Sequence, residues 1–294
     1  MGNDESSAAD EITALEERRA YADQSSLRKS LVAGADSTSW LNDIVTAGVD
    51  ELTEGMSIGS LLLTPTGHVR AHFQVVRMKE DLLLLQDRRQ PEAVADLLSP
   101  YVLSSDVRVE DRSEALAVFS LPGKDTGPGS LPVWRPSILG EGVDVIVESD
   151  AKDAAASELR AALIQASEQA IEAWRIRRGV PRFPIDFGTD ALPAEAGLES
   201  AIDFEKGCFL GQESVAKVRN LGHPPRVLLA LRARERVEAG DSIMAVGDEA
   251  GTVTSAAGDG AGGTALIARI RWGARDEPLS TAAGTPLAAA TPVS

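Results

Sequence analysis

The chain has 294 residues, 43% of them hydrophobic and 25% charged, and a formal net charge of −16 at pH 7. A chain of this length can bury a core of its own and favours two or three domains. So acidic a protein is repelled by phosphate backbones and anionic lipid. We therefore expect a globular protein with no general nucleic-acid binding and no membrane binding.

The sequence also predicts a cytoplasmic location. Its acidic beginning, MGNDESSAADEITALEERRA, lacks the basic and then apolar order of a signal peptide. No apolar run reaches the roughly 18 residues that indicate a membrane-spanning helix. Cys208 is the only cysteine, so no intramolecular disulfide can form, which fits a reducing compartment. The three histidines and one cysteine show no ligand spacing, and we expect no metal site.

Short strands and helices alternate without a strict βαβ pattern, which predicts an α+β fold. We expect a mobile extension over residues 1–24, a first α+β subdomain over 25–120 and a second over 121–222. Short apolar runs between glycine-rich turns predict a C-terminal β-barrel domain over 223–294. The expected elements are strands at 31–33, 61–63, 69–76, 82–85, 107–109, 115–119 and 143–147, a helix near Trp40, another from Pro91, and one long helix over 157–178.

The segment KGCFLGQE, Lys206 to Glu213, stands out chemically. Lys206-Gly207 predicts a tight turn, and Gly211 bends the chain again before a helix that begins at Gln212. Cys208 would then lie close to a lysine and a helix N-terminus, and both favour the thiolate form. The alternative is that Cys208 is a small buried apolar residue and that the glycines only build a turn.

KGCFLGQE and the following SVAKVRNLGHPPRVL resemble the YgfZ group of folate-binding proteins, which is related to the T-protein aminomethyltransferase of the glycine cleavage system. WRIRRGVPRFPIDFGTDALPAE, GADSTSWLNDIVT and LLLTPTGHVRAHFQVV resemble further segments of that group. The resemblance implies three domains in a ring with tetrahydrofolate or a derivative in the central opening. It also implies a role in the assembly or repair of iron–sulfur enzymes, including tRNA-modifying ones, so the expected partners are a reduced folate and iron–sulfur client proteins.

The resemblance further implies which residues serve the site. Cys208 would be a functional thiol assisted by Lys206. The residues expected near the folate are Gly207, Gly211, Gln212, Glu213, Trp174, Arg175, Arg177 and His72.

Each of these residues also has a structural interpretation. Arg175, Arg177 and Arg178 would complement a helix C-terminus, or bind the glutamyl tail of folate through charge-assisted hydrogen bonds. Trp174 would be a core or ring-lining aromatic, or a dedicated stacking platform, and His72 would be solvated or replace a missing carboxylate. Gln212 and Glu213 would cap a helix or contact a ligand.

Three functions remain open from the sequence: a folate-binding accessory factor, a folate-dependent aminomethyltransferase, and an interaction scaffold without a ligand. The transferases carry a carboxylate in the hairpin, where this chain has Gly67 to His72. They also carry a helix-end glutamate that grips the pterin, where this chain has Arg177. Both departures favour the accessory factor over an enzyme of the transferase kind.

Overall fold

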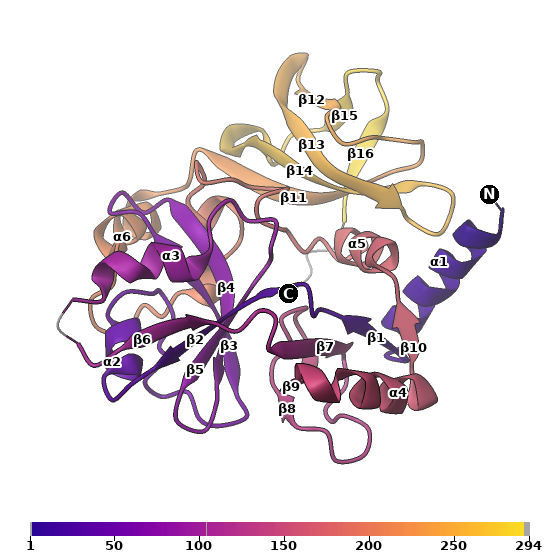
Figure 1. The fold of residues 1–294 in the computed structure, drawn as a ribbon. Coiled ribbons are helices and arrows are strands. Elements are labelled where there is room, and N and C mark those ends of the chain that lie inside the picture. Colours follow the sequence, from indigo (N-terminus) through magenta and orange to yellow (C-terminus); the bar gives the residue numbers. More distant parts are fainter. Residues whose placement is uncertain (1, 104, 291–294) are drawn as a thin grey trace.

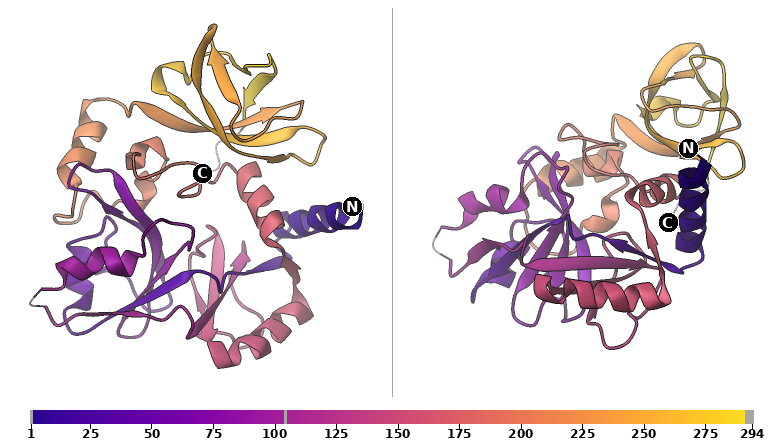
Figure 2. Two further views of the ribbon diagram at one scale, coloured as in Figure 1. Left: turned by 45° about the horizontal axis from the view of Figure 1, so that its top comes forward. Right: turned by 45° about the vertical axis from the view of Figure 1, so that its right-hand side comes forward.

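The computed structural model describes residues 2–103 and 105–290, which form two five-stranded sheets and a closed six-stranded barrel. The two sheets lie beside each other, and the barrel lies across from them (Figure 1). Turned views show the three bodies arranged around a common centre (Figure 2). The predicted fold class, two mixed α/β subdomains with a C-terminal β-barrel, is confirmed.

The first sheet is entirely antiparallel and includes the predicted hairpin. On β4, Ala71, Phe73 and Val75 pack into one core, whereas Val76 packs into a different one. Both faces of the strand are therefore covered along most of its length, and its partly exposed residues are Arg70, His72 and Arg77. The strand order is β3 (Ser57–Leu63), β4 (Val69–Arg77), β5 (Leu82–Gln86), β2 (Arg28–Ala33) and β6 (Arg108–Asp111), with α2 (Ser37–Asn42), α3 (Val94–Leu98) and the 3-10 turn η1 (Ser99–Tyr101) in the connections.

The second sheet is built from distant parts of the chain. Its strand β1 pairs in parallel with β10 on one side and antiparallel with β7 on the other. The domain boundary that we expected after residue 120 falls inside β7. The strand order is β10 (Ile164–Ala166), β1 (Ala20–Asp23), β7 (Leu116–Pro122), β9 (Gly142–Glu148) and β8 (Val133–Trp134), with the 3-10 turn η2 (Ser149–Ala151) and α4 (Lys152–Ala162) after β9.

Two expectations for the helices were wrong. Residues 2–24 hold a helix, α1 (Gly2–Glu16), and the strand β1, because Ile12 and Leu15 form a narrow apolar stripe that packs with Ile171 of α5. The helix expected over 157–178 is two helices, α4 and α5 (Glu168–Arg177), with β10 between them. Ser167 caps α5, since its hydroxyl accepts a hydrogen bond from the Ala170 N–H.

The C-terminal half leads from α5 through a long irregular segment to the barrel. That segment ends in α6, the helix predicted after Gly211. In the described parts of the chain no helix is long and apolar enough to cross a bilayer. The elements are η3 (Pro193–Glu195), η4 (Glu199–Ala201), α6 (Gln212–Leu221), β11 (Arg226–Ala233), β12 (Ser242–Ala245), β13 (Asp248–Gly258), β14 (Thr264–Arg271), η5 (Trp272–Ala274), β15 (Leu279–Thr281) and β16 (Pro286–Ala289).

Candidate functional site

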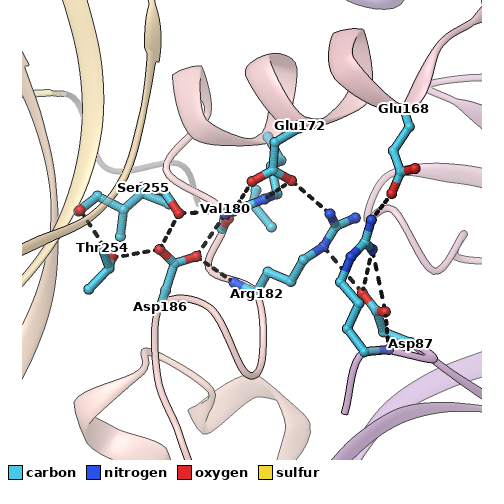
Figure 3. A network of polar contacts seen from close by, with 11 residues as sticks. Asp87, Glu168, Glu172, Val180, Arg182, Asp186, Thr254 and Ser255 are labelled. Carbon is cyan, nitrogen blue, oxygen red and sulfur yellow. Dashed lines mark hydrogen bonds and ion pairs between the residues drawn. The ribbon is translucent and has the colours of Figure 1, made fainter. Parts of the chain in front are cut away.

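Arg175 on α5 lies at the centre of a buried polar network. Four of its partners, Glu172, Val180, Asp186 and Ser255, are labelled in Figure 3. All five of its guanidinium N–H groups donate: to both carboxylate oxygens of Glu172, to the Val180 carbonyl, to Asp186 Oδ2 at 2.7 Å and to Ser255 Oγ at 3.0 Å. An arginine in this state has no donor left for a ligand. It therefore fixes the architecture of the site and does not grip an anion.

Asp186 joins this network to the barrel. Its Oδ1 accepts hydrogen bonds from the hydroxyls of Thr254 and Ser255 on β13, both at 2.6 Å. Its Oδ2 accepts from Arg175 and from the Arg182 backbone N–H. The carboxylate thus has its lone pairs occupied and ties α5, the loop after it and the barrel together.

Arg182 extends the network to the first sheet. It donates to Glu172 Oε2 at 2.7 Å and lies 3.3 Å from Asp87, which follows β5. Asp87 also pairs with Arg89, which in turn contacts Glu168 at the start of α5. Burial alone would raise the pKa of Glu172. The hydrogen bond and charge of Arg175, together with the charge of Arg182, outweigh burial, so the pKa of Glu172 is lowered. This carboxylate therefore stays ionised near neutral pH.

A cavity of about 130 Å³ lies against this network, between the first sheet and α5. Trp174 is buried in its wall, and the indole Nε1–H has no hydrogen-bond partner among the described residues. A buried donor left unpaired is costly, and such groups in native proteins indicate a missing water or ligand. The polar walls come from Gln24, His72, Gln74, Asp87, Gln90, Arg175 and Arg182, and the apolar walls from Leu27, Phe73, Ile138, Leu139, Ile171, Trp174, Val180, Pro181 and Phe183.

His72 contributes a neutral ring to this cavity. Burial lowers its pKa to about 4, and the nearby negative charge of Asp87 only partly opposes this effect. The His72 backbone is held by Gln90, whose amide accepts from the His72 N–H and donates to its carbonyl. A neutral imidazole at this place can donate one hydrogen bond and accept another, but it does not carry the charge of the carboxylate expected in the transferases.

The KGCFLGQE turn lies apart from this cavity: none of its residues is among those that line it. Lys206 Nζ donates to three backbone carbonyls at the end of α2, those of Asn42, Val45 and Ala47, at 2.5 to 2.8 Å. Burial lowers the pKa of this ammonium to about 8, while Asp203 opposes the shift. Its donors are occupied, so Lys206 fastens the turn to α2 and does not offer them to the thiol.

The two glycines of the turn have different roles. Gly211 has φ +81°, and a Cβ there would lie 2.5 Å from the Thr64 carbonyl oxygen in the turn of the β3–β4 hairpin. A Cβ on Gly67, in that same turn, would lie 2.7 Å from Ser214 Cβ. Gly211 therefore lets α6 pack against the hairpin, whereas a Cβ on Gly207 meets no atom within 4 Å.

Cys208 is exposed on this turn, which excludes the alternative that it is a buried packing residue. Gln212 begins α6, and no side chain caps that helix end. Glu213 pairs with Lys217 one turn later, at 2.7 Å, and that hydrogen bond and charge lower the pKa of the Glu213 carboxyl. The turn thus presents a thiol at the surface beside an exposed helical ion pair.

Arg177, which occupies the position of the transferase glutamate, points away from the cavity. Its Nε donates to the Gly258 carbonyl at 2.8 Å, and its guanidinium lies 3.5 Å from Glu16 of α1. Arg178 lies over the ring of Trp174, with 5.0 Å between its guanidinium carbon and the ring centroid. Of the residues we expected at the folate, only His72, Trp174 and Arg175 meet in one place.

Sequence reasoning missed the carboxylates of the network. The spacing of Glu172 and Arg175, three residues apart on one helix, was a usable signal for an ion pair. Asp87 and Asp186 carried no such signal, because the partners that link them across domains, Arg182 for Asp87 and the β13 hydroxyls for Asp186, are distant in the sequence. The cavity does contain an acidic group, Asp87. This carboxylate lies at the end of β5, and not in the hairpin where the transferase carboxylate was expected.

Known proteins that resemble this chain share its first domain, part of its sequence or its fold. Residues 3–130 match the model of the GCVT N-terminal domain. The chain is 23% identical to "Putative transferase At1g60990, chloroplastic" of Arabidopsis thaliana over 77% of its length, and the match spans 59% of that protein. It is 26% identical to "tRNA-modifying protein YgfZ" of Colwellia psychrerythraea, over 69% of this chain and 68% of the relative.

Two further matches extend the comparison. "Iron-sulfur cluster assembly factor IBA57 homolog, mitochondrial" of Cryptococcus neoformans is 25% identical, over 68% of this chain and 63% of that protein. The crystal structure of aminomethyltransferase T from Bartonella henselae superposes with a TM-score of 0.80 at 17% identity, covering 96% of this chain and 89% of that one. The resemblance seen in the sequence is thereby confirmed: the chain is similar to YgfZ-type proteins and shares the fold of the aminomethyltransferase of the glycine cleavage system.

Proposed function

We propose that this protein is a folate-binding accessory factor that supports the assembly or repair of iron–sulfur enzymes, including tRNA-modifying ones, in the cytoplasm. The observation that carries the folate part is the cavity beside α5, where the buried indole N–H of Trp174 lacks a partner. The names of the YgfZ and IBA57 relatives support the iron–sulfur part.

The residues around the cavity fit the ring system of a reduced folate. The pterin has several hydrogen-bond donors and acceptors on a flat, partly apolar ring. Trp174 offers an unpaired donor and His72 a neutral imidazole. Gln74 and Gln90 also line the cavity, but the Gln74 amide nitrogen donates to Ser57 and Pro136, and Gln90 holds the His72 backbone. The cavity, at about 130 Å³, is smaller than the roughly 300 Å³ at which small-molecule sites usually begin. It would therefore hold the ring, while the rest of the ligand extends outside.

The bound folate would supply a carrier of one-carbon units. This chain's own residues would orient the ring through Trp174 and His72, while the Arg175 network keeps the wall of the cavity rigid. Cys208 would act from the surface turn as the thiol that meets the client. Aminomethyl transfer is disfavoured, because Ala71 and His72 stand in the hairpin where the transferases use a carboxylate, and Asp87 is already held by Arg89 and Arg182.

Two measurements test this function. Calorimetric titration with tetrahydrofolate and 5-formyltetrahydrofolate should show binding that Trp174→Phe weakens, because Phe keeps the ring and removes the N–H. In a strain that lacks the gene, wild-type protein should restore the activity of iron–sulfur tRNA-modifying enzymes, and Cys208→Ala should not, although it is equally abundant. Absence of heat with every reduced folate would remove the folate part, and full restoration by Cys208→Ala would remove the thiol.

A further inference from the structure

An apolar hollow beside α6 is separate from the proposed folate cavity. It encloses about 380 Å³ and shares no lining residue with the cavity beside α5. We call it the α6 groove; it lies between α6, the segment that contains η3 and η4, and η5 of the barrel. Its apolar walls include Leu192, Ile202, Phe204, Val215, Val218 and Trp272.

The aromatic walls of the α6 groove are held in place before anything binds. Arg219 lies over the ring of Phe204, 4.0 Å from its centroid. His223 stacks on Trp272 with 5.1 Å between ring centroids and 5° between ring planes, and Arg275 lies 4.0 Å from the centroid of the same indole. Because these walls are already fixed, little side-chain entropy is lost when a ligand binds. This favours the interpretation that the groove is a binding site over the interpretation that it is a packing defect.

The rim of the groove offers negative charge. Glu199 lines the groove and is exposed, and Glu205 is exposed directly after Phe204. Neither carboxylate has a side-chain partner among the described residues. Of the positive charges nearby, Lys206 donates to backbone carbonyls and Arg275 pairs with Asp276, whereas Arg219 lines the groove with its guanidinium over the Phe204 ring. The carboxylates of Glu199 and Glu205 thus face one guanidinium, and in a protein of net charge −16 this balance favours a cationic occupant.

We propose that the α6 groove docks a segment of a client protein in which an aromatic or branched apolar side chain is flanked by lysine or arginine. The apolar side chain fills the groove, and the flanking cations face Glu199 and Glu205. The inference rests on the proposed function, since it gives the accessory factor a recognition surface. Cys208 lies four residues beyond Phe204, so a segment seated in the groove brings its client to the turn that carries the thiol.

Three labelled peptides test this surface by fluorescence anisotropy at low ionic strength. One carries Trp-Leu flanked by lysines, the second carries Trp-Leu flanked by glutamates, and the third carries Ala-Ala flanked by lysines. The first should bind at least about tenfold more tightly than either of the others, a difference that combines apolar burial with charge. Equal affinity for all three would overturn the proposal.

Matched variants assign the binding to the groove. Val218→Glu, on the partly exposed side of α6, and Glu199→Lys, on the rim, should each reduce affinity for the first peptide about tenfold. Glu80→Lys changes the net charge as Glu199→Lys does, but it lies on the β4–β5 turn and should have no effect. If neither groove variant weakens binding, or if 5-formyltetrahydrofolate displaces the peptide, the groove is not a client site.

The same variants keep this inference distinct from the proposed function. Folate titration of Val218→Glu and Glu199→Lys should match the wild type, which also verifies that both variants fold. A wild-type protein that binds folate normally but shows no preference among the three peptides would overturn the docking surface alone. A wild-type protein that binds the first peptide but no reduced folate would overturn only the folate-binding part of the proposed function.

Discussion

Arg175 and Asp186 form an ion pair from which water is almost excluded: the two side chains are 5% and 0% exposed, and 2.7 Å separates Nη1 from Oδ2. The pair joins α5 to the loop that follows it, and through Thr254 and Ser255 it reaches the barrel. Buried charges of this kind cost a great deal when one partner is lost, because the other remains desolvated and uncompensated.

Asp186→Ala should therefore lower the free energy of unfolding by about 3–5 kcal/mol, the cost of leaving a buried charge unpaired. Urea denaturation followed by fluorescence measures this loss. The matched control is Glu168→Ala, which removes an exposed partner of Arg89 and should cost less than about 1 kcal/mol. Similar losses in both variants would show that the buried network does not hold the domains together.

Gly211→Ala and Gly207→Ala form a second matched pair within the cysteine turn. Gly211→Ala should destabilise the protein by about 1–2 kcal/mol from its left-handed conformation alone, and the contact with the Thr64 carbonyl adds to that cost. Gly207→Ala should change stability little, since its Cβ meets open space. Thermal unfolding of the two proteins tests this, and a larger loss in Gly207→Ala would contradict the assigned roles.

Lys206→Met should cost about 1–3 kcal/mol, because the Asn42, Val45 and Ala47 carbonyls lose a common donor. The control, Lys217→Met, removes an exposed helical ion pair and should cost about 0.5 kcal/mol at most. The rate at which iodoacetamide alkylates Cys208 should change more in Lys206→Met, since the turn is no longer fastened to α2. Equal stability of the two variants would refute the fastening role.

His72 gives stability a predictable pH dependence. Its folded-state pKa is about 4, below the ordinary 6.5, so the unfolded chain binds a proton first as the pH falls. The stability that neutral His72 contributes is present above pH 6.5 and is lost progressively down to about pH 4, by about 3 kcal/mol in total. His72→Gln cannot titrate and should lack this loss.

The comparison must be made between wild type and His72→Gln, because Asp144 acts in the opposite direction. Burial raises the pKa of Asp144 to about 6, against hydrogen bonds from Ser120, Ser137 and the Ile138 N–H. That group contributes stability below the ordinary pKa of 3.8, and the contribution is lost as the pH rises to about 6. Parallel pH curves for wild type and His72→Gln would contradict the prediction for His72.

The parts of the fold that the sequence predicted are those fixed by neighbours along the chain. Pro65-Thr66-Gly67 between two apolar runs was enough to predict the β3–β4 hairpin, and Gly211 before Gln212 was enough to predict the start of α6. Helix α1 and strand β10 were missed because tertiary contacts stabilise them: α1 packs on α5, and β10 has only three residues and pairs with β1.

The candidate site divides in the same way. The cysteine turn could be located from its own residues, and its exposure agrees with a functional thiol. That His72 and Trp174 share a cavity followed from the family resemblance, but the separation of the turn from that cavity did not. The role of Arg177 was also inaccessible, because its partners, Gly258 and Glu16, lie at opposite ends of the chain.

The pairing of β1 sets an order for folding during synthesis. The first sheet is complete once residue 111 has left the ribosome, and the barrel strands all follow residue 225. Strand β1 emerges before either, yet its neighbours β7 and β10 begin only at residues 116 and 164, and the helix that covers α1 begins at residue 168. Helix α1 and strand β1 are therefore translated before the elements they pack against, and they reach their native places only once residues up to α5 have been made.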